Sequence, residues 1–302
     1  MKKNQKIRFG LCCLFIEEKI SFKSTTFKHF ASLSSSEQEK KLDLIVLHNI
    51  KSLLQAIEAC AVQKIHSFRI ISTLLPLYTH PEVSYDLHEL PSAKEIMNLF
   101  AKCKSKAEET DIRLTFHPDQ FVVLNSPKDE IVKKSIEDLN YHVLLSDLLG
   151  ADVINIHAGG VYGDKTKALE RLRNTISCLP SDILKRLSFE NDDKSYSPVD
   201  LLPICEEFGL PLVYDVHHHR CLKDALSEQE ASKLAYATWN REPLFHISSP
   251  KDGWDGPQPL RHHDYINPDD FPLFWKDMLP LTVDIEAKAK EIAVHKIMQD
   301  LY

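Results

Sequence analysis

Short apolar runs alternate along the chain with longer amphipathic stretches, a pattern that predicts strands separated by helices. The strand-like runs are Ile7–Leu14, Phe68–Ser72, Ile112–His117, Val153–His157, Leu187–Glu190, Leu212–Asp215, Leu244–Ile247 and Thr282–Glu286. Strict alternation of strands and helices predicts a parallel sheet. Eight such units in 302 residues predict an α/β protein with a single (β/α)8 TIM barrel over residues 1–302.

Capping signals place several of the helices. Ser36-Glu37-Gln38-Glu39 reads as a capping box that starts a helix toward Ala61, and a break near His48 is left open. Pro127 and Gly150 suit the two ends of a long helix. Asn267-Pro268 is expected to start the helix that follows the seventh strand.

Composition narrows the class of protein. With only 8 glycines and no linker-like run, a second domain is not indicated. The net charge of −7 is a mild argument against nucleic-acid binding, although bound divalent cations would cancel charge where a phosphate sits. The 7 cysteines are odd in number and lack a CxxC pair, which argues against a disulfide framework or a thiolate zinc site.

The distribution of charge also bears on location. Arg8, Glu17, Glu18 and Lys19 interrupt the first apolar run, so it does not resemble a signal peptide. We find no uninterrupted apolar stretch that approaches 18 residues, and we therefore expect no membrane span. These features predict a cytoplasmic protein.

Histidines and carboxylates gather at the C-terminal ends of the predicted strands, which is the end where barrel enzymes carry their active sites. They are His117, His157, Glu190, Asp215, His218, His246 and Glu286, with His262 in the loop after the seventh strand. Nitrogen and oxygen ligands without thiolates suit zinc or manganese. Eight ligands exceed the needs of one ion and predict a cluster of two or three. A single histidine here would usually be structural, but chance would not put so many at one end.

Some positions within this set stay open. Asp215 and His218, three residues apart, are favoured as a pair over His217 and His219, which we expect behind the ligands or facing solvent. One of the adjacent His262 and His263 is expected to bind.

Other polar and aromatic residues near the strand ends allow two interpretations. Gln120 and Phe121 either wedge into a base stack or form an ordinary turn with one buried ring. The loop cations Arg220, Lys251 and Arg261 are candidate phosphate contacts. Trp239, Trp254 and Trp275 either pack in the core or stack on a ligand.

Taken together, the motifs resemble the UV-damage endonuclease family over about residues 7–300. The matching segments are Phe116–Pro127, His157–Gly160, Tyr162–Lys165, Leu187–Asp193, Asp215–His219, His246–Ser249 and Asp284–Lys288. The resemblance implies a barrel related in fold to endonuclease IV and xylose isomerase. It implies an enzyme that nicks damaged double-stranded DNA immediately 5′ of cyclobutane dimers or 6-4 photoproducts, leaving 3′-hydroxyl and 5′-phosphate ends.

The resemblance also implies residue roles. It gives the same eight metal ligands and a manganese-type cluster, with zinc, magnesium or cobalt as alternatives. It implies that His80 lies near the metals or the scissile phosphate, and that Gln120 and Phe121 probe the damaged duplex. We hypothesise that Glu190, Asp215 and Glu286 orient the attacking hydroxide. The expected partner is damaged duplex DNA, the expected state is a monomer, and no protein partner is assigned.

Three positions depart from the family pattern. The family often has tyrosine in place of Phe121 and an aromatic residue in place of Leu11, and many members carry a lysine in place of Leu244. The Phe121 ring can still wedge, whereas Leu11 cannot stack. If the lysine contacts the scissile phosphate, this chain lacks that contact.

Two other kinds of function fit the same barrel. One is an apurinic-site endonuclease or a sugar isomerase, and the other is a damage-binding protein whose catalysis has decayed. An isomerase needs a closed sugar pocket, whereas a DNA enzyme needs an open groove, which we expect to be positive, across the barrel mouth. The complete ligand set argues against decay.

Overall fold

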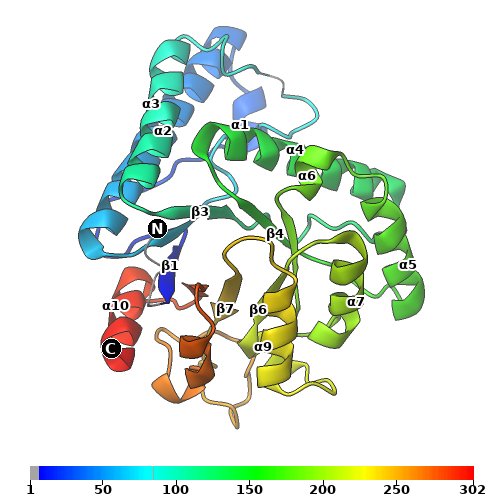
Figure 1. Cartoon of the computed structure of the whole chain (residues 1–302). Coiled ribbons are helices and arrows are strands. Elements are labelled where there is room, and N and C mark those ends of the chain that lie inside the picture. The colour runs from blue at the N-terminus through cyan, green and yellow to red at the C-terminus, as the bar shows by residue number, and fades with distance from the viewer. Residues whose placement is uncertain (1–6, 84) are drawn as a thin grey trace.

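In the computed structural model, which describes residues 7–83 and 85–302, eight parallel strands close into one barrel (Figure 1). Each strand pairs with its neighbours in the chain, and β8 closes the barrel by pairing with β1. The strands are β1 Arg8–Cys12, β2 Ser67–Ile70, β3 Arg113–Phe116, β4 Val153–His157, β5 Leu187–Glu190, β6 Leu212–Asp215, β7 Leu244–Ile247 and β8 Thr282–Ile285. The predicted TIM barrel is confirmed.

Helices surround the barrel on the outside (Figure 1). They are α1 Phe27–Ala31, α2 Ser35–Gln63, α3 Ala93–Glu109, α4 Asp129–Leu149, α5 Lys165–Ile176, α6 Ser181–Leu184, α7 Pro198–Phe208, α8 Val216–Cys221, α9 Glu228–Ala237 and α10 Lys290–Leu301, with 3₁₀ turns η1 Pro268–Asp270 and η2 Leu273–Asp277. Helix α2 is long and apolar enough to cross a membrane by length and composition alone. One of its faces, which carries Leu42, Val46, Ile50, Leu53 and Ile57, is nevertheless buried in the core, as expected for a packing helix.

Two helix predictions were wrong in informative ways. The α2 capping box is formed by Ser34 and Glu37 rather than by Ser36 and Glu39, and α2 runs through His48 without a break. After β7 the expected helix is replaced by the turns η1 and η2. Pro272 stands between these turns, and its lack of an amide hydrogen prevents a helix started at Pro268 from propagating.

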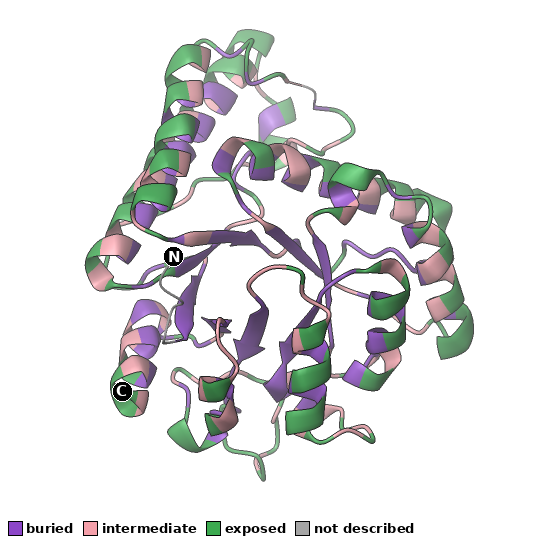
Figure 2. Cartoon of the chain, in the orientation of Figure 1, coloured by how far each residue is buried: buried purple, intermediate pink, exposed green. Residues whose placement is uncertain are grey.

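The strands present different chemistry on their two faces. Their outward side chains pack with the helices into the main apolar core, as the buried strands of Figure 2 illustrate. Because alternate residues point inward, the barrel interior is a column of mostly polar side chains. Its inward-facing residues include Gly10, Ser67, Thr115, Asn155, Ser188 and Asp284, together with a small apolar cluster of Val153, Val213 and Leu244. This polar column leads up to the C-terminal ends of the strands.

At the opposite end, where the strands begin, arginines close the column. Arg8 pairs with Glu242 at 2.9 Å, and Arg113 pairs with Asp152 at 2.9 Å. All seven cysteines are free, in line with the expectation of no disulfide framework.

Candidate metal centre

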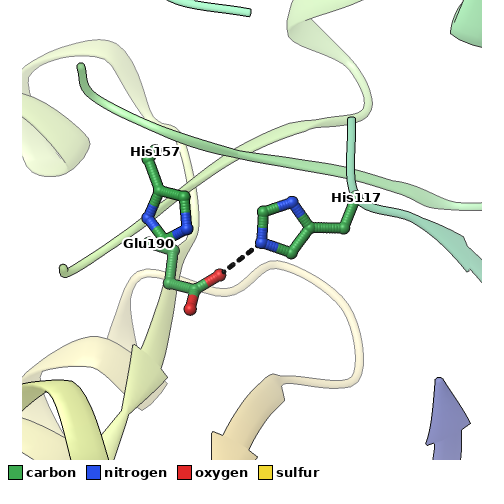
Figure 3. A group of neighbouring side chains, drawn as sticks. All are labelled: His117, His157 and Glu190. Atoms are coloured by element: carbon green, nitrogen blue, oxygen red, sulfur yellow. Dashed lines mark ion pairs between the residues drawn. The ribbon is translucent and has the colours of Figure 1, made fainter. Parts of the chain in front are cut away.

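The buried carboxylate of Glu190, at the end of β5, lies at the centre of the predicted ligands. Its Oε2 is 3.0 Å from His117 Nε2 and 3.2 Å from His246 Nδ1. Its Oε1 is 3.3 Å from His218 Nδ1. Figure 3 shows His117 and His157 directed toward this carboxylate. One side chain therefore meets ligands delivered by β3, β7 and α8.

Two groups of side chains bring their ligand atoms within 4.8 Å of one another. The first is His117, His157 and Glu190, and the second is Glu190, Asp215 and His218. A carboxylate shared between two groups suits a bridge between two ions, and nitrogen and oxygen donors without sulfur suit manganese or zinc.

A third set forms around Glu286, directly after β8. Its Oε1 lies 3.4 Å from His246 Nδ1, and its Oε2 lies 3.7 Å from His262 Nδ1. His262 is held in place by an antiparallel bridge to Pro250. The structure thus brings all eight predicted ligands into one continuous patch.

Local folding decides which of the consecutive histidines face this patch. The Asp215 side chain accepts a hydrogen bond from the His218 amide at 2.8 Å and so caps α8. His218 then turns toward Glu190, while His219 bonds Tyr214 at 2.8 Å and Asp224 at 3.0 Å on the other side.

Two further histidines, His263 and His217, lie beside the patch. The ring of His263 is occupied by the backbone of Tyr265, which leaves His262 facing Glu286. His217 is buried against Trp254 and His262, and its ring nitrogens form no hydrogen bond with the described residues.

Several buried ligand atoms lack hydrogen-bond partners within the described part of the chain, including His157 Nδ1, Glu190 Oε1, Asp215 Oδ2 and His246 Nδ1. An unsatisfied buried polar atom costs about 1–3 kcal/mol, so such a concentration indicates a site for a ligand that accepts their lone pairs. His117 fits this use, because its Nδ1 donates to the Pro118 carbonyl at 3.1 Å and its Nε2 faces the site. The residues present therefore fit divalent metal ions.

The charges of the centre are strongly coupled. Burial would raise the pKa of Glu190, but the imidazoles of His246, His157 and His117 hold it well below its usual range. Burial would lower the pKa of His218, but Asp215 and Glu190 raise it well above the usual value. For His117 burial dominates and its pKa is lowered. Glu190 thus stays ionised and requires positive charge, from protonated histidines or from metal ions.

Side chains beneath the ligands were missed by sequence reasoning. Asn155 donates to Glu190 Oε2, and Asn191 exchanges two hydrogen bonds with the backbone of Asp215, at 2.9 and 3.0 Å. Arg69 donates to Glu286 at 2.6 Å and to Asp284 at 3.3 Å. Asn155 and Asp284 each lie two residues before a ligand, on the same inward face. Asn155 and Asp284 could therefore have been found in the sequence by examining the residue two positions before each predicted ligand.

His80 lies outside the cluster. Its ring stacks on Phe27 with 4.0 Å between centroids, and its Nδ1 accepts a hydrogen bond from the Glu82 amide at 3.2 Å. Its neighbours Thr79 and Pro81 line the groove beside the cluster. His80 itself lines an adjacent pocket with Glu137 and Tyr141, at the edge of this groove.

That groove, of about 920 Å³, is open to solvent and is bordered by α4 and the loops after β3, β4 and β5. His157 and His218 line it, as do Gln120 and Phe121, and the Phe121 side chain is 77% exposed. Its charged lining comprises Lys134 and Lys194, with Asp119, Asp138, Asp192 and Asp193. The expectation of an open groove is met, but the expectation of a positive one is wrong.

The departures from the family pattern are buried at two of the three positions. Leu11 is fully buried in the apolar core, where it offers no surface to a ligand. Leu244 packs with Val153, Val213 and Trp239 below the ligand level of the barrel. At the third position, Phe121, the ring is exposed.

The three candidate phosphate contacts differ in their surroundings, and the tryptophans can now be placed. Arg220 is bound to Glu228 at 2.7 Å and lies over the Trp254 ring, whereas Lys251 and Arg261 are exposed. Trp239 and Trp275 are used in packing: the indole N–H of Trp239 donates to the Leu212 carbonyl, and that of Trp275 donates to Ser232.

Comparison with known proteins gives this centre a context. The sequence profile of the family described as UV-endonuclease UvdE matches residues 7–302. The chain belongs to the UvdE family. The UV DNA damage endonuclease of Halalkalibacterium halodurans is 34% identical over 310 residues, covering 98% of this chain and 94% of the relative. That of Bacillus cereus is 32% identical over 289 residues, covering 92% and 89%.

Solved structures agree with membership of the UvdE family. The crystal structure of SacUVDE superposes with a TM-score of 0.87 at 31% identity and covers 98% of both chains. Endonuclease IV from Thermus thermophilus superposes with a TM-score of 0.61 at 13% identity over 97% of both chains. At that identity the second likeness concerns the fold alone.

Proposed function

We propose that this UvdE family member is a metal-dependent DNA-repair endonuclease. It cuts the phosphodiester immediately 5′ of a UV photoproduct, a cyclobutane dimer or a 6-4 photoproduct, and leaves 3′-hydroxyl and 5′-phosphate ends. The observation that carries the proposal is the convergence of eight histidine and carboxylate ligands, with Glu190 at their centre, beside an open groove. The names of the relatives support the substrate class.

The ligand sets fit two or three divalent ions, with manganese as the first choice and zinc, magnesium or cobalt as alternatives. The three sets are His117, His157 and Glu190; Glu190, Asp215 and His218; and His246, His262 and Glu286. Such ions, when bound, stabilise charge on the attacked phosphate and on the leaving 3′ oxygen. They would also supply the positive charge that the groove lacks.

The carboxylates of the chain orient the attacking water. Glu190 and Glu286 suit this role because their pKa values are held low, so both remain ionised acceptors. Burial opposes ionisation in both, and the neighbouring imidazoles, together with Arg69 at Glu286, overcome it. Asp215, capped into α8, completes the three. His80 is proposed to contact the DNA phosphate from the rim.

Gln120 and Phe121 are proposed to probe the damaged duplex. The exposed Phe121 ring can enter a weakened base stack, as apolar wedges do in DNA-bending proteins. Photoproducts disturb stacking, so extruding damaged nucleotides costs less than extruding normal ones. Selectivity then needs no reading of base edges.

The test is a nicking assay with Mn²⁺ on a duplex that carries one cyclobutane dimer, compared with an undamaged duplex. We expect a single cut 5′ of the dimer, loss of cutting with EDTA, and loss of cutting in Glu190→Ala. Glu242→Ala is the matched control, because Glu242 is a partly buried, ion-paired glutamate at the opposite end of the barrel.

Three other outcomes would contradict the proposal. Tight binding of the damaged duplex without cutting would indicate a damage-binding protein. Cutting restricted to apurinic duplex would indicate an apurinic-site endonuclease. Neither cutting nor binding of DNA would direct attention to sugar substrates.

A further inference from the structure

A buried ion pair lies directly beneath the ligands of β7 and β8. Arg69, on β2, donates through Nε to Asp284 Oδ2 at 3.3 Å. Both side chains are inside the barrel, and Asp284 is wholly buried. Neither residue belongs to the eight candidate ligands.

The same guanidinium extends from Asp284 to a ligand. Arg69 Nη2 donates to Glu286 Oε1 at 2.6 Å, while Oε2 of that carboxylate faces His262 Nδ1 at 3.7 Å. A planar guanidinium can hold two carboxylates in fixed directions, which a lysine ammonium cannot do. Arg69 therefore fixes which oxygen of Glu286 turns toward His262.

The position of Asp284 is itself built by neighbouring strands. Gly10 of β1 stands opposite Asp284 in register, and a Cβ at Gly10 would lie 2.0 Å from Asp284 Oδ1. Ser67 of β2 donates to the same oxygen at 3.4 Å. A glycine is needed here for space, because any side chain would displace the carboxylate.

His246 is the second ligand in contact with the pair. Its Nδ1 faces Glu190 and Glu286, and its Nε2 lies 3.3 Å from Arg69 Nη2 and 3.8 Å from Asp284 Oδ2. Because a guanidinium can only donate, Nε2 of His246 accepts from Arg69, and the ring carries its proton on Nδ1, toward Glu190 and Glu286. Asp284 Oδ2, at 3.8 Å, is too far from Nε2 for a hydrogen bond, so the pair contacts this ring through Arg69 alone.

We propose that Arg69 and Asp284 are positioning residues that hold Glu286 ready for a divalent metal ion, with Gly10 providing the space. The inference rests on the proposed function. Because the two charges offset each other, the pair orients this ligand without adding net positive charge that would oppose a cation.

The test is isothermal titration of the metal-free full chain with Mn²⁺. Arg69→Lys keeps the charge but cannot bridge two carboxylates, and Asp284→Asn keeps the shape but loses the charge. We expect either change to weaken Mn²⁺ binding by about 10- to 100-fold at a subset of the sites. Nicking of dimer-containing DNA should return when Mn²⁺ is raised, which a purely structural defect would not allow.

The matched control is Arg113→Lys, which alters another buried, ion-paired arginine of the barrel interior at the end away from the ligands. It should leave Mn²⁺ affinity unchanged. Gly10→Ala is a third variant, which displaces Asp284 without changing any charge. Circular dichroism identifies the variants that fold, and each folded variant tests the positioning role by its Mn²⁺ affinity.

Folded Arg69→Lys, Asp284→Asn or Gly10→Ala protein with wild-type Mn²⁺ affinity and stoichiometry would overturn the positioning role. Failure of the proposed function looks different, because the wild-type chain would then bind no Mn²⁺ or cut no damaged DNA. A wild-type chain that binds and cuts, with unaffected variants, contradicts this inference alone.

Discussion

The two halves of the centre are supported by different chemistry. In the β3–β6 half, formed by His117, His157, Glu190, Asp215 and His218, amide side chains support the carboxylates: Asn155 bonds Glu190, and Asn191 holds the backbone of Asp215. In the β7–β8 half, formed by His246, His262 and Glu286, a buried ion pair takes that place. An amide orients a carboxylate without adding charge, whereas an ion pair works only while both partners remain.

The halves also differ in what they face. His157 and His218 of the β3–β6 half line the open groove with Gln120 and Phe121. Glu190 contacts both halves, through His117 and His218 on one side and His246 on the other. The comparison therefore predicts that loss of Glu190 weakens metal binding in both halves, whereas loss of other ligands weakens it in one half.

The largest effect is expected for Glu190→Gln. The change keeps the shape but removes the charge shared by both halves, so Mn²⁺ binding should fall in both and nicking should drop by roughly 1,000-fold or more. Titration and single-turnover nicking measure this, with Glu242→Gln as the control. Loss of binding in only one half would show that Glu190 does not join them.

A smaller effect is expected for Asn155→Ala. Without its amide donor, Glu190 loses a fixed orientation, and Mn²⁺ binding should weaken by about 10- to 100-fold. Asn174→Ala, on the surface of α5, serves as the control.

Combining Asn155→Ala with Arg69→Lys sharpens the comparison. If the halves are independent apart from Glu190, the two changes in binding free energy should add within about 0.5 kcal/mol. A larger deviation would mean that the two supports act as one network.

Phe121→Ala should affect DNA without affecting metal. The loss of one stacking ring is worth about 1–3 kcal/mol of binding free energy, so affinity for damaged duplex should fall while Mn²⁺ affinity stays the same. Val62→Ala, an exposed residue near the end of α2, is the control. Altered Mn²⁺ binding in Phe121→Ala would mean that the rim and the centre are coupled.

The smallest effect concerns pH. In metal-free protein the pKa values of His218 and His246 are raised by their carboxylate neighbours, which overcome the effect of burial. Their stabilising contribution is complete below the unfolded value of about 6.5 and is lost as pH rises through the folded values. The pKa of Glu190 is lowered, so its contribution is present above about 4.5 and is lost as pH falls through its folded value.

These groups together favour mildly acidic pH for the metal-free chain. With EDTA, the melting temperature should fall by a few degrees from mildly acidic to alkaline pH, at about 2–4 °C per kcal/mol. With Mn²⁺ the trend should reverse, since the ions replace the protons. Calorimetry measures both series, and identical trends with and without metal would contradict the assignment of these histidines.

The barrel and its ligand ends were predictable because both follow from local patterns. Apolar runs gave the strands, and the parallel arrangement placed His117 and Glu286 at the same end. The supports were not predictable in the same way. Arg69 within an apolar run gives no sign that it faces Glu286, and only the pairing of β1 with β8 shows that Gly10 faces Asp284. The absence of a helix after β7 likewise depends on the position of Pro272 between η1 and η2.

The layered construction of the barrel separates what keeps the chain folded from what makes it reactive. Most of the apolar packing lies outside the strands and most of the polar side chains lie inside, so the two can be altered separately. Solved barrels with 10–14% identity to this chain still superpose with TM-scores of 0.51–0.61. For protein engineers, the inner column is therefore the natural place to randomise when new activities are sought on this scaffold.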